Sequence, residues 1–485
     1  MAFPRKRVLL FTNSELGQAN VVLATSHALL ELGAEVHFAS FSAIEDLVTA
    51  VSKEIRFHPI DGVDMKTAYP RDEVARSGLE GKTPRFWNMP RVLRICLHTT
   101  MPWSGPEYVD IYRSVIAILQ EVSPSIIAVD PAFSPAITAC KHMGERFLIL
   151  APNTIKDFAI SYQPARDVFF TYPCIASGLP FPLPWYYVLL NIYYVLLAIA
   201  ICRWDRKSRE VKRYIKDYTA GEMVSLEDLN RRPPPGVKYL VANLPEIEFA
   251  LKTIPPHIIP CGPITRPVTR PVTESDPHLA RWLDRGPTVY INLGTHAKTT
   301  EATAIEMAKS LAFLLRLARQ RGGEKKEVDG SLQVLWKLTR KGDYGNDSIG
   351  MVLRDVQDAV RIVEWVAPEP SAVLAHRNVI CAVHHGGANS FLEAVTAGLP
   401  QIVLPVWIDC FDYANRAEVL EIGRWGNRTA RPRCVATELG PVLVGVIFGP
   451  GAAKYKENAE ALARLCGRDL EPGRIKAART ILAEI

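Results

Sequence analysis

The sequence lacks the features that mark several classes of protein. None of its nine cysteines stands in Cys-x-x-Cys spacing, so neither a zinc site nor a disulfide framework is expected. The net charge of +6 is small for 485 residues, and basic residues do not alternate with aromatic ones as they do on many nucleic-acid-binding surfaces. We therefore expect neither a disulfide-stabilised secreted protein nor a nucleic-acid-binding protein.

The amino terminus lacks a long apolar run. A basic start is followed by apolar residues only at positions 8–11, fewer than the roughly 7 to 15 residues of a secretion signal. Repeats and low-complexity tracts are also missing, and 48% hydrophobic with 22% charged residues is ordinary for a folded chain. We expect a cytoplasmic protein of two or three domains.

The first half begins with a β-α-β pattern. Strands are predicted at residues 7–12 and 35–40, with a helix between them at 19–32. The intervening turn has no Gly-x-Gly-x-x-Gly, so a dinucleotide cofactor is not favoured. A later strand ends at Asp130. Because ligands gather at the carboxyl ends of parallel strands, the turn near Gln18 and Asp130 should line one site.

The second half contains the most informative stretch, residues 365–415. A buried strand is predicted at 379–383, then a turn that contains Gly386 and Gly387, then a helix from Ser390 that ends at Gly398. Free N-H groups at a helix start attract anions, and glycines let a phosphate approach the backbone. The pattern predicts an anion site.

Three polar residues give this site its specificity. Glu393 lies four residues after Asn389 and three after Ser390, so the three side chains lie close on one helix face. Short polar groups suit a phosphate, and a carboxylate one turn further on suits ribose hydroxyls. The sequence therefore predicts a nucleotide site.

This stretch resembles the signature of the family 1 UDP-glycosyltransferases, in a form similar to their fungal branch. The matching residues, in order, are Trp365, Pro368, Leu374, His376, His385, Gly387, Ser390, Glu393, Ala394, Gly398, Pro400, Pro405 and Asp409. The resemblance implies two Rossmann-like α/β domains of the GT-B type, with parallel sheets that face a central cleft. It also implies an enzyme that uses a UDP-sugar.

The resemblance assigns a role to each matching site residue. Trp365 would stack on uracil, although a core aromatic is the simpler interpretation of a lone tryptophan. The diphosphate would be held by His385, Gly387, Asn389 and Ser390, and by a second turn at Gly294 and Thr295. Glu393 would bind the ribose, and Asp409 would reach the sugar unless it only caps a helix. The family's two glutamines are replaced by Glu369 and Cys410, which leaves the sugar unidentified.

The usual catalytic base of the family is missing. The resemblance places a histidine after Gly17, but the residue there is Gln18, and an amide does not accept a proton near neutral pH. His27 would lie about 13 Å further along the helix, too far to replace it. We predict that Asp130 takes the proton while Gln18 holds the acceptor; a cap on the turn before Pro131 is the alternative for Asp130.

Residues 185–202 form a long apolar stretch rich in tyrosine. Its length approaches that of a membrane span, but Asn191 and the tyrosines also suit a segment that lies on a membrane surface. A helix buried over an apolar acceptor pocket is the third interpretation. The last two both favour a lipophilic acceptor.

The expected organisation is an acceptor domain at 1–262, a Pro- and Thr-rich linker at 263–277, a donor domain at 278–450 and closing helices at 451–485 that return to the first domain. The predicted function is inverting transfer from a UDP-sugar to a hydroxyl of a terpenoid, polyketide or sterol, without a metal. The alternatives are a nucleotide-sugar-binding protein with weak or no activity and a sugar-nucleotide epimerase.

Overall fold

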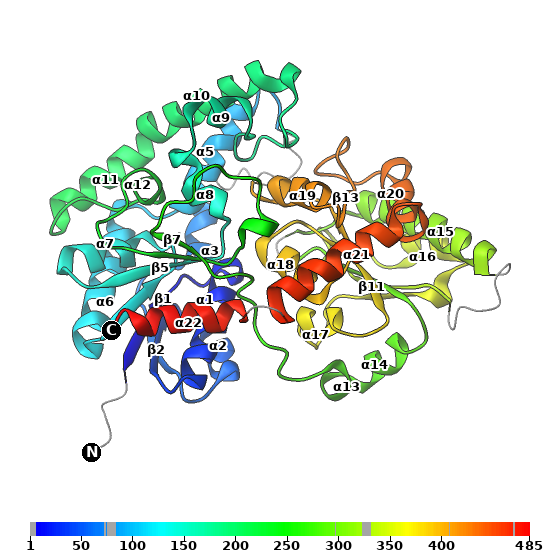
Figure 1. The fold of residues 1–485 in the computed structure, drawn as a ribbon, viewed down its shortest axis with the longest axis horizontal. Coiled ribbons are helices and arrows are strands. Elements are labelled where there is room, and N and C mark those ends of the chain that lie inside the picture. The colour runs from blue at the N-terminus through cyan, green and yellow to red at the C-terminus, as the bar shows by residue number, and fades with distance from the viewer. Residues whose placement is uncertain are drawn as a thin grey trace. The chain divides into compact units, whose positions relative to one another are not determined.

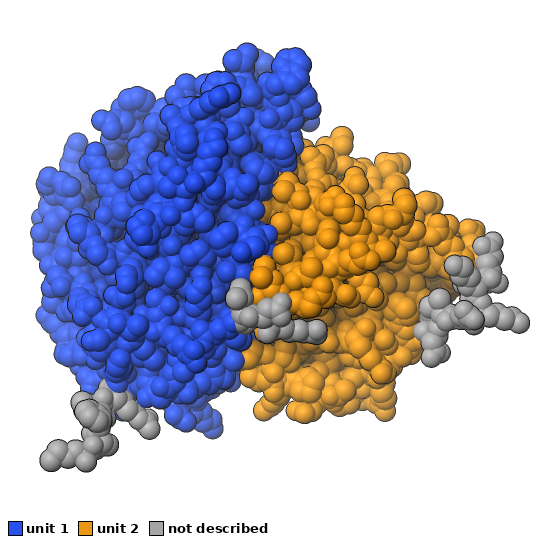
Figure 2. All heavy atoms as spheres, viewed as in Figure 1, with its two compact units in different colours: residues 1–79, 84–266, 471–485 blue, residues 80–83, 267–470 orange. Residues whose placement is uncertain are grey.

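The chain forms two compact units (Figure 2). The computed structural model describes residues 6–71, 74, 84–295, 297–322, 331–406, 408–468 and 471–485. Unit 1 comprises residues 1–79, 84–266 and 471–485, and unit 2 comprises residues 80–83 and 267–470. The first unit thus ends at 266 where 262 was expected. Of the closing segment expected from 451, only the part from 471 belongs to unit 1.

Unit 1 is a parallel sheet with helices around it (Figure 1). The strands, in the spatial order β3-β2-β1-β4-β5-β6-β7, are β1 (Arg7–Phe11), β2 (Glu35–Ser40), β3 (Arg56–Pro59), β4 (Ile126–Val129), β5 (Phe147–Ala151), β6 (Tyr239–Val241) and β7 (Ile258–Pro260). The helices are α1 (Leu16–Glu31), α2 (Glu45–Val51), α3 (Met65–Ala68), α5 (Met89–Thr100), α6 (Gly105–Val122), α7 (Ser134–Met143), α8 (Ile155–Ala159), α9 (Ala165–Phe170), α10 (Val188–Trp204), α11 (Arg206–Tyr218), α12 (Leu226–Arg231) and α22 (Gly473–Ala483).

Unit 2 repeats this architecture with a six-stranded parallel sheet in the order β10-β9-β8-β11-β12-β13. The strands are β8 (Thr288–Asn292), β9 (Gln333–Lys337), β10 (Val360–Val363), β11 (Val379–His384), β12 (Gln401–Val403) and β13 (Gly423–Trp425). The helices are α13 (Val272–Ser275), α14 (Pro277–Leu283), α15 (Glu301–Gly322), α16 (Asp347–Leu353), α17 (Pro370–Leu374), α18 (Ala388–Ala397), α19 (Cys410–Val419), α20 (Ala436–Phe448) and α21 (Ala452–Ala463).

Each unit has its own hydrophobic core. The central strands are continuous apolar runs such as Ile126–Val129, all four residues of which are buried, as expected for a parallel sheet covered on both faces. The core of unit 1 gathers side chains from β1, β4, β5 and the helices α6 and α7. In unit 2, separate clusters cover the two faces of the second sheet.

The segment between the two sheets is less extended than predicted. Residues 261–271 have no helix or strand, but α13 and α14 already occupy 272–275 and 277–283. Asp276 caps α14 by accepting a hydrogen bond from the Leu279 backbone N-H. Helical structure therefore begins at 272, inside the segment predicted as a linker.

Both sheets reverse their strand order at one position. In unit 1 the chain order reverses between β1 and β4, and in unit 2 between β8 and β11. At such a position the loops after two neighbouring strands diverge and leave room for a ligand at the carboxyl edge of the sheet. The turns after β1, β4, β8 and β11 are therefore where sites are expected. The catalytic and phosphate-binding candidates from the sequence lie on these turns or in the first turn of the helix that follows.

Candidate active site

In unit 2, the turns after β8 and β11 meet through the ring of His385. β11 pairs with β8 so that His384 lies opposite Asn292. A Cβ on Gly294 would lie 2.8 Å from Cε1 of His385, and a Cβ on Gly387 would lie 2.5 Å from Nε2 of the same ring. The imidazole therefore occupies space that only glycine leaves open on both sides. The structure thus brings together three of the six residues that the resemblance assigned to the diphosphate, Gly294, His385 and Gly387.

Gly386 brings a third element to this turn. Its φ of +87° favours glycine, and a Cβ here would lie 2.8 Å from the carbonyl oxygen of Cys410. Cys410 is the first residue of α19, and Asp409 precedes it as the half-buried N-cap residue. Cys410 itself is fully buried, so it offers no side-chain group where the family has a glutamine.

His384 links the turn between β11 and α18 to the neighbouring strand β12. Its Nε2–H donates to Oε1 of Gln401 (2.8 Å), and its Nδ1 accepts from the Gly386 backbone N-H (3.1 Å). Burial lowers the pKa of His384 to about 4, so the ring is neutral at pH 7 and one nitrogen is free to accept. This neutral tautomer holds the backbone of Gly386 in place.

Helix α18 starts at this turn. Its N-cap residue is Gly387, whose missing side chain leaves the helix without a side-chain cap. Asn389 and Ser390, both half-buried, lie in the first turn of the helix. Ser390 and Glu393 also line a small pocket together with Tyr290 and Asn292 from β8. A ligand over the turn would thus meet the positive end of the helix first and a carboxylate one turn later.

The indole of Trp365 lies at the surface. It is 67% exposed, which rules out the core interpretation of this residue. The ammonium of Lys337, the last residue of β9, lies 4.5 Å from the centre of the ring. Burial lowers the pKa of Lys337. Thr295, in the turn after β8, is also exposed.

In unit 1, the carboxylate of Asp130 lies at the carboxyl end of β4, next to the turn after β1. Oδ2 of Asp130 accepts from Thr12 Oγ1 (3.1 Å) and Asn13 Nδ2 (2.8 Å), and Oδ1 accepts from the Ala132 backbone N-H (2.8 Å). Asp130 has no exposed surface, and this burial raises its pKa to about 6 although the hydrogen bonds oppose the shift.

That Asp130 itself takes the acceptor's proton stays a prediction, but these contacts favour a supporting role for its carboxylate. A base must reach its proton, and this carboxylate is covered and already accepts hydrogen bonds at both oxygens. Asp130 supports the turn instead, because it holds Asn13, whose side-chain oxygen accepts from the Glu15 backbone N-H (2.6 Å). Its contact with the Ala132 N-H also realises the turn-capping alternative.

Glu15 and Gln18 are among the partly exposed residues of this turn. Gln18 lies in the first turn of α1, and its side-chain oxygen is buried without a hydrogen-bond partner among the described residues. His27 lies further along α1, where it pairs with Glu31 at 3.3 Å. Glu15 precedes α1 as its N-cap residue. Sequence reasoning passed over Glu15 because it concentrated on the position after Gly17.

Known proteins with similar sequences are glycosyltransferases. The chain is 31% identical to glycosyltransferase sdnJ of Sordaria araneosa, over 98% of this chain and 97% of that protein. It is 28% identical to UDP-glycosyltransferase 84B1 of Arabidopsis thaliana, over 44% of this chain and 47% of that protein. The chain belongs to the family 1 UDP-glycosyltransferases.

Further comparisons agree with this family. Residues 346–463 match the family described as erythromycin biosynthesis protein CIII-like, C-terminal domain. The glycotransferase of kitacinnamycin has the same fold, with a TM-score of 0.65 at 16% identity over 99% of this chain and 100% of that one. Phytolacca americana UGT2, solved with UDP-2fluoro-glucose and pterostilbene, gives 0.64 at 16% identity over 100% and 99%. The fold is thus of the GT-B type, and the protein is a UDP-sugar glycosyltransferase.

Two further features bear on the site of this glycosyltransferase. Among the residues that the structure describes, no three His, Cys, Asp or Glu side chains gather as metal ligands would.

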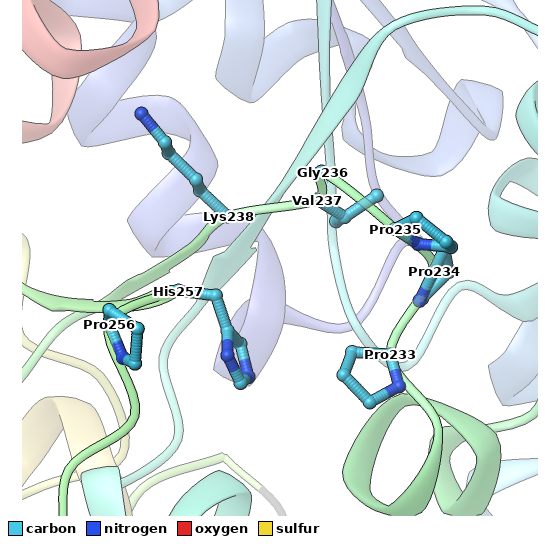
Figure 3. A pocket seen from close by; sticks show the side chains of 8 residues that line it. All are labelled: Pro233, Pro234, Pro235, Gly236, Val237, Lys238, Pro256 and His257. Carbon is cyan, nitrogen blue, oxygen red and sulfur yellow. The ribbon is translucent and has the colours of Figure 1, made fainter.

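A hollow in unit 1 lies between the proline loop Pro233–Pro235 on one side and Pro256 and His257 on the other (Figure 3). Because these residues precede β6 and β7, the hollow lies at the amino edge of the sheet, opposite to Asp130, and does not belong to the site.

Sequence reasoning missed several residues of the donor half of the site. Lys337 ends β9 and covers one face of Trp365, while Tyr290 and Asn292 of β8 line the pocket beside Glu393. The rule that ligands gather at the carboxyl ends of strands would have selected Lys337 and Asn292. Tyr290 lies inside a buried strand, where nothing in the pattern distinguishes it from core.

Proposed function

We propose that unit 2 holds the UDP-sugar over the turns after β8 and β11, and that unit 1 holds a lipophilic hydroxyl acceptor near the turn after β1. The observation that supports the donor half is the ring of His385 between Gly294 and Gly387. This packing places the turn directly before the start of α18, which has no side-chain cap, and a helix start of this kind favours a diphosphate.

The donor would be bound in three parts. The diphosphate is assigned to the turns at Gly294–Thr295 and His385–Gly387, with Asn389 and Ser390 as side-chain donors. The ribose hydroxyls are assigned to Glu393, and the sugar to Asp409. Uracil is assigned to the exposed indole of Trp365, whose other face lies against Lys337.

The transfer itself would proceed with inversion. The acceptor oxygen attacks the anomeric carbon from the side opposite UDP and loses its proton, and the bond from that carbon to the diphosphate oxygen breaks. The negative charge that develops on UDP faces the positive end of α18 and the N-H groups of its first turn. Because these groups compensate the charge, we propose that transfer needs no metal.

We assign the acceptor's proton to Glu15. It is the partly exposed carboxylate of the turn, and Asn13 holds its backbone N-H while Asp130 holds Asn13. The side-chain oxygen of Gln18, without a partner among the described residues, would accept a hydrogen bond from the bound acceptor. Asp130 is then a positioning residue, which keeps the turn in shape.

The acceptor class is inferred from the apolar stretch at residues 185–202 and from the relatives. The rings next to the turn do not bear on it, because Phe133 packs on Phe41 and Trp103 inside the core of unit 1. Among the relatives, Mogroside I-E synthase of Siraitia grosvenorii is 30% identical over 40% of this chain and 38% of that protein. We propose a terpenoid, polyketide or sterol secondary metabolite as the acceptor class.

Incubation with several UDP-sugars and a library of lipophilic aglycones tests this function, with mass spectrometry to detect conjugates and NMR to assign the anomer and any isomerised nucleotide sugar. The proposal predicts an aglycone mass increased by one sugar, equal amounts with and without a chelator, and the anomer opposite to that of the donor. An isomerised nucleotide sugar would identify an epimerase instead. Bound but unchanged UDP-sugar with every aglycone would identify a nucleotide-sugar-binding protein, and either result would overturn the proposal.

A further inference from the structure

Helix α10 places apolar side chains in solvent. Of its residues, only Asn191, Tyr194 and Ile201 are buried. On the outer side, Leu189 is 82% and Leu196 53% exposed, and Trp185, just before the helix, is 85% exposed. The usual arrangement of a surface helix, apolar inside and polar outside, is therefore reversed.

The buried polar residue shows that this helix is firmly part of unit 1. The Asn191 side-chain oxygen accepts from the Cys174 backbone N-H (2.7 Å), and its amide donates to the carbonyls of Phe169 (3.0 Å) and Tyr172 (2.9 Å). The helix also packs against α5 and α9. The exposed face is thus a fixed surface of a folded unit, and not a detached segment.

The apolar surface continues beyond α10. The ring of Phe86 lies 4.7 Å from that of Tyr193 on the helix, and Trp87 beside it is 86% exposed. Soluble monomers rarely expose contiguous apolar patches of large size unless the patch binds something. We call this surface the α10 patch; its exposed members are Phe86, Trp87, Phe170, Ile175, Trp185, Tyr186, Leu189, Leu196, Ile199 and Trp204.

Two of the three interpretations of residues 185–202 do not agree with this geometry. By length and composition Trp185–Tyr218 qualifies as a membrane span, but Asn191 bonds α10 to the segment 169–174 of unit 1. The contacts of α10 with α5 and α9 would also have to break. A helix buried over a pocket is contradicted by the exposed outer side, since only 22% of its apolar window is buried.

Basic residues follow the patch directly. Helix α11 continues from α10 along the outer side of unit 1 (Figure 1) and packs on α6 through Val211 and Ile215. Its outward positions and the end of α10 carry exposed cations, at Arg203, Arg206, Arg209, Arg213 and Lys216. Arg206 pairs with Glu210 and Lys216 with Glu222, and the cations still outnumber the exposed carboxylates of α11, Glu210 and Asp217. Apolar and aromatic side chains next to a row of cations are the composition of a surface that binds anionic lipid.

We infer that the α10 patch docks on a lipid bilayer that carries anionic headgroups. Helix α10 would lie in the plane of the interface with Leu189 and Leu196 among the acyl chains. Trp185 and Trp204, at its two ends, would lie at the level of the headgroups, where tryptophan is enriched. The cations of α11 would face the phosphate and carboxylate groups of the lipid. This inference does not depend on the proposed acceptor.

Flotation of the full chain with vesicles tests the inference. The protein should float with phosphatidylcholine vesicles that contain phosphatidylserine, and less with phosphatidylcholine alone. The double variant Leu189→Glu/Leu196→Glu and the double variant Arg206→Glu/Arg209→Glu should each lower the partition coefficient by about tenfold or more. Met351→Glu is the matched control, because Met351 is 75% exposed in unit 2 and outside the patch, and it should float like the wild type.

Each other outcome overturns the inference. These are no flotation of the wild type, equal flotation of all variants, or retention on membranes through a carbonate wash, which would indicate a span. Dimers in ultracentrifugation that the leucine variant dissociates, without vesicle binding, would identify a second copy as the occupant. Unchanged circular dichroism and unchanged transfer to a water-soluble acceptor would show that the variants are folded, whichever way the flotation falls.

Discussion

At the scale of single residues, the proposed donor site requires glycine beside His385, because a Cβ there would collide with the imidazole ring. Gly294 has φ +81° and would place a Cβ 2.8 Å from the His385 ring, while Gly342 has φ +94° with no atom within 4 Å of such a Cβ. Both positions disfavour alanine by about 1 kcal/mol through the backbone. Only at position 294 would the alanine methyl group also displace the His385 ring.

Gly294→Ala is therefore expected to raise the Kd for UDP by about tenfold or more, because the displaced ring disturbs the phosphate turn. Gly342→Ala should lower the free energy of unfolding by about 1 kcal/mol and leave the Kd for UDP unchanged. Calorimetric titration with UDP and denaturant unfolding of both variants check this. Equal effects of the two substitutions on the Kd would show that the ring contact does not matter for binding.

The neutral ring of His384 makes stability depend on pH. An unfolded chain takes up its proton below about pH 6.5, whereas the folded ring resists protonation down to about pH 4. The stability that the ring contributes is therefore present at neutral pH and is lost as the pH falls through this window. Between pH 7 and pH 5 we expect wild type to lose about 2 kcal/mol more than His384→Gln in denaturant unfolding. Parallel pH curves would contradict the assignment of a neutral ring.

Substitutions of the carboxylates near the turn after β1 can distinguish the proposed base, Glu15, from Asp130, which is proposed to support the turn. Glu15→Gln should lower kcat by about 10² to 10³ with little change in the KM for the UDP-sugar, because it removes only the proton acceptor. Asp64 is the control, since it accepts from the Ser14 hydroxyl (3.2 Å) and the Thr67 N-H (2.8 Å), and Asp64→Asn should stay within about threefold of wild type. If Asp130→Asn removed activity while Glu15→Gln kept it, the carboxylate of Asp130 would be the base after all.

At the scale of elements, the buried side chain of Asn191 bonds α10 to the segment 169–174. Asn191 satisfies three backbone groups of the segment 169–174 and is fully buried. Asn191→Ala leaves those groups without partners, which should lower the free energy of unfolding by about 2 to 4 kcal/mol. Leu189→Glu on the same helix should change it by less than about 0.5 kcal/mol. Thermal and denaturant unfolding measure both, and similar losses would mean that Asn191 does not anchor the helix.

The elements also show how far a sequence can be interpreted. Strand β2 lies at 35–40 as predicted, and β1 and β11 lie within one residue of their predicted ends, because fully buried strands are continuous apolar runs with turn residues at their ends. Helix α10 was recognisable as apolar, but a helix that is apolar all round carries no pattern that tells its outer side from its inner side. Its exposure depends on Asn191 and the segment it binds, which only the fold brings together.

Asp130 illustrates the same limit within the site. Its position at a strand end was predictable, but its burial depends on Thr12 and Asn13, which lie 118 and 117 residues away in the chain. The glycine turn between β11 and α18 was predictable because glycines, a strand end and a helix start are all local. Contacts between distant segments decided which residues are accessible, and so moved the proposed base from Asp130 to Glu15.

At the scale of the whole molecule, the chain consists of two Rossmann-like units of the GT-B type, each with a reversal of strand order that carries part of the proposed chemistry. The donor half depends most on one turn, where a Cβ on Gly387 would lie 2.5 Å from the His385 ring. Ligand binding stabilises only the folded state, by about 2.7 kcal/mol at a hundredfold excess over the Kd. UDP should therefore both bind to and stabilise the whole chain.

Calorimetric titration of UDP into wild type and Gly387→Ala tests the central claim most directly. The account predicts saturable heat with one UDP per chain for wild type, and a Kd raised by about tenfold or more for Gly387→Ala, whose new methyl group would displace the ring. No heat with folded wild type, or the same Kd for both proteins, would contradict it.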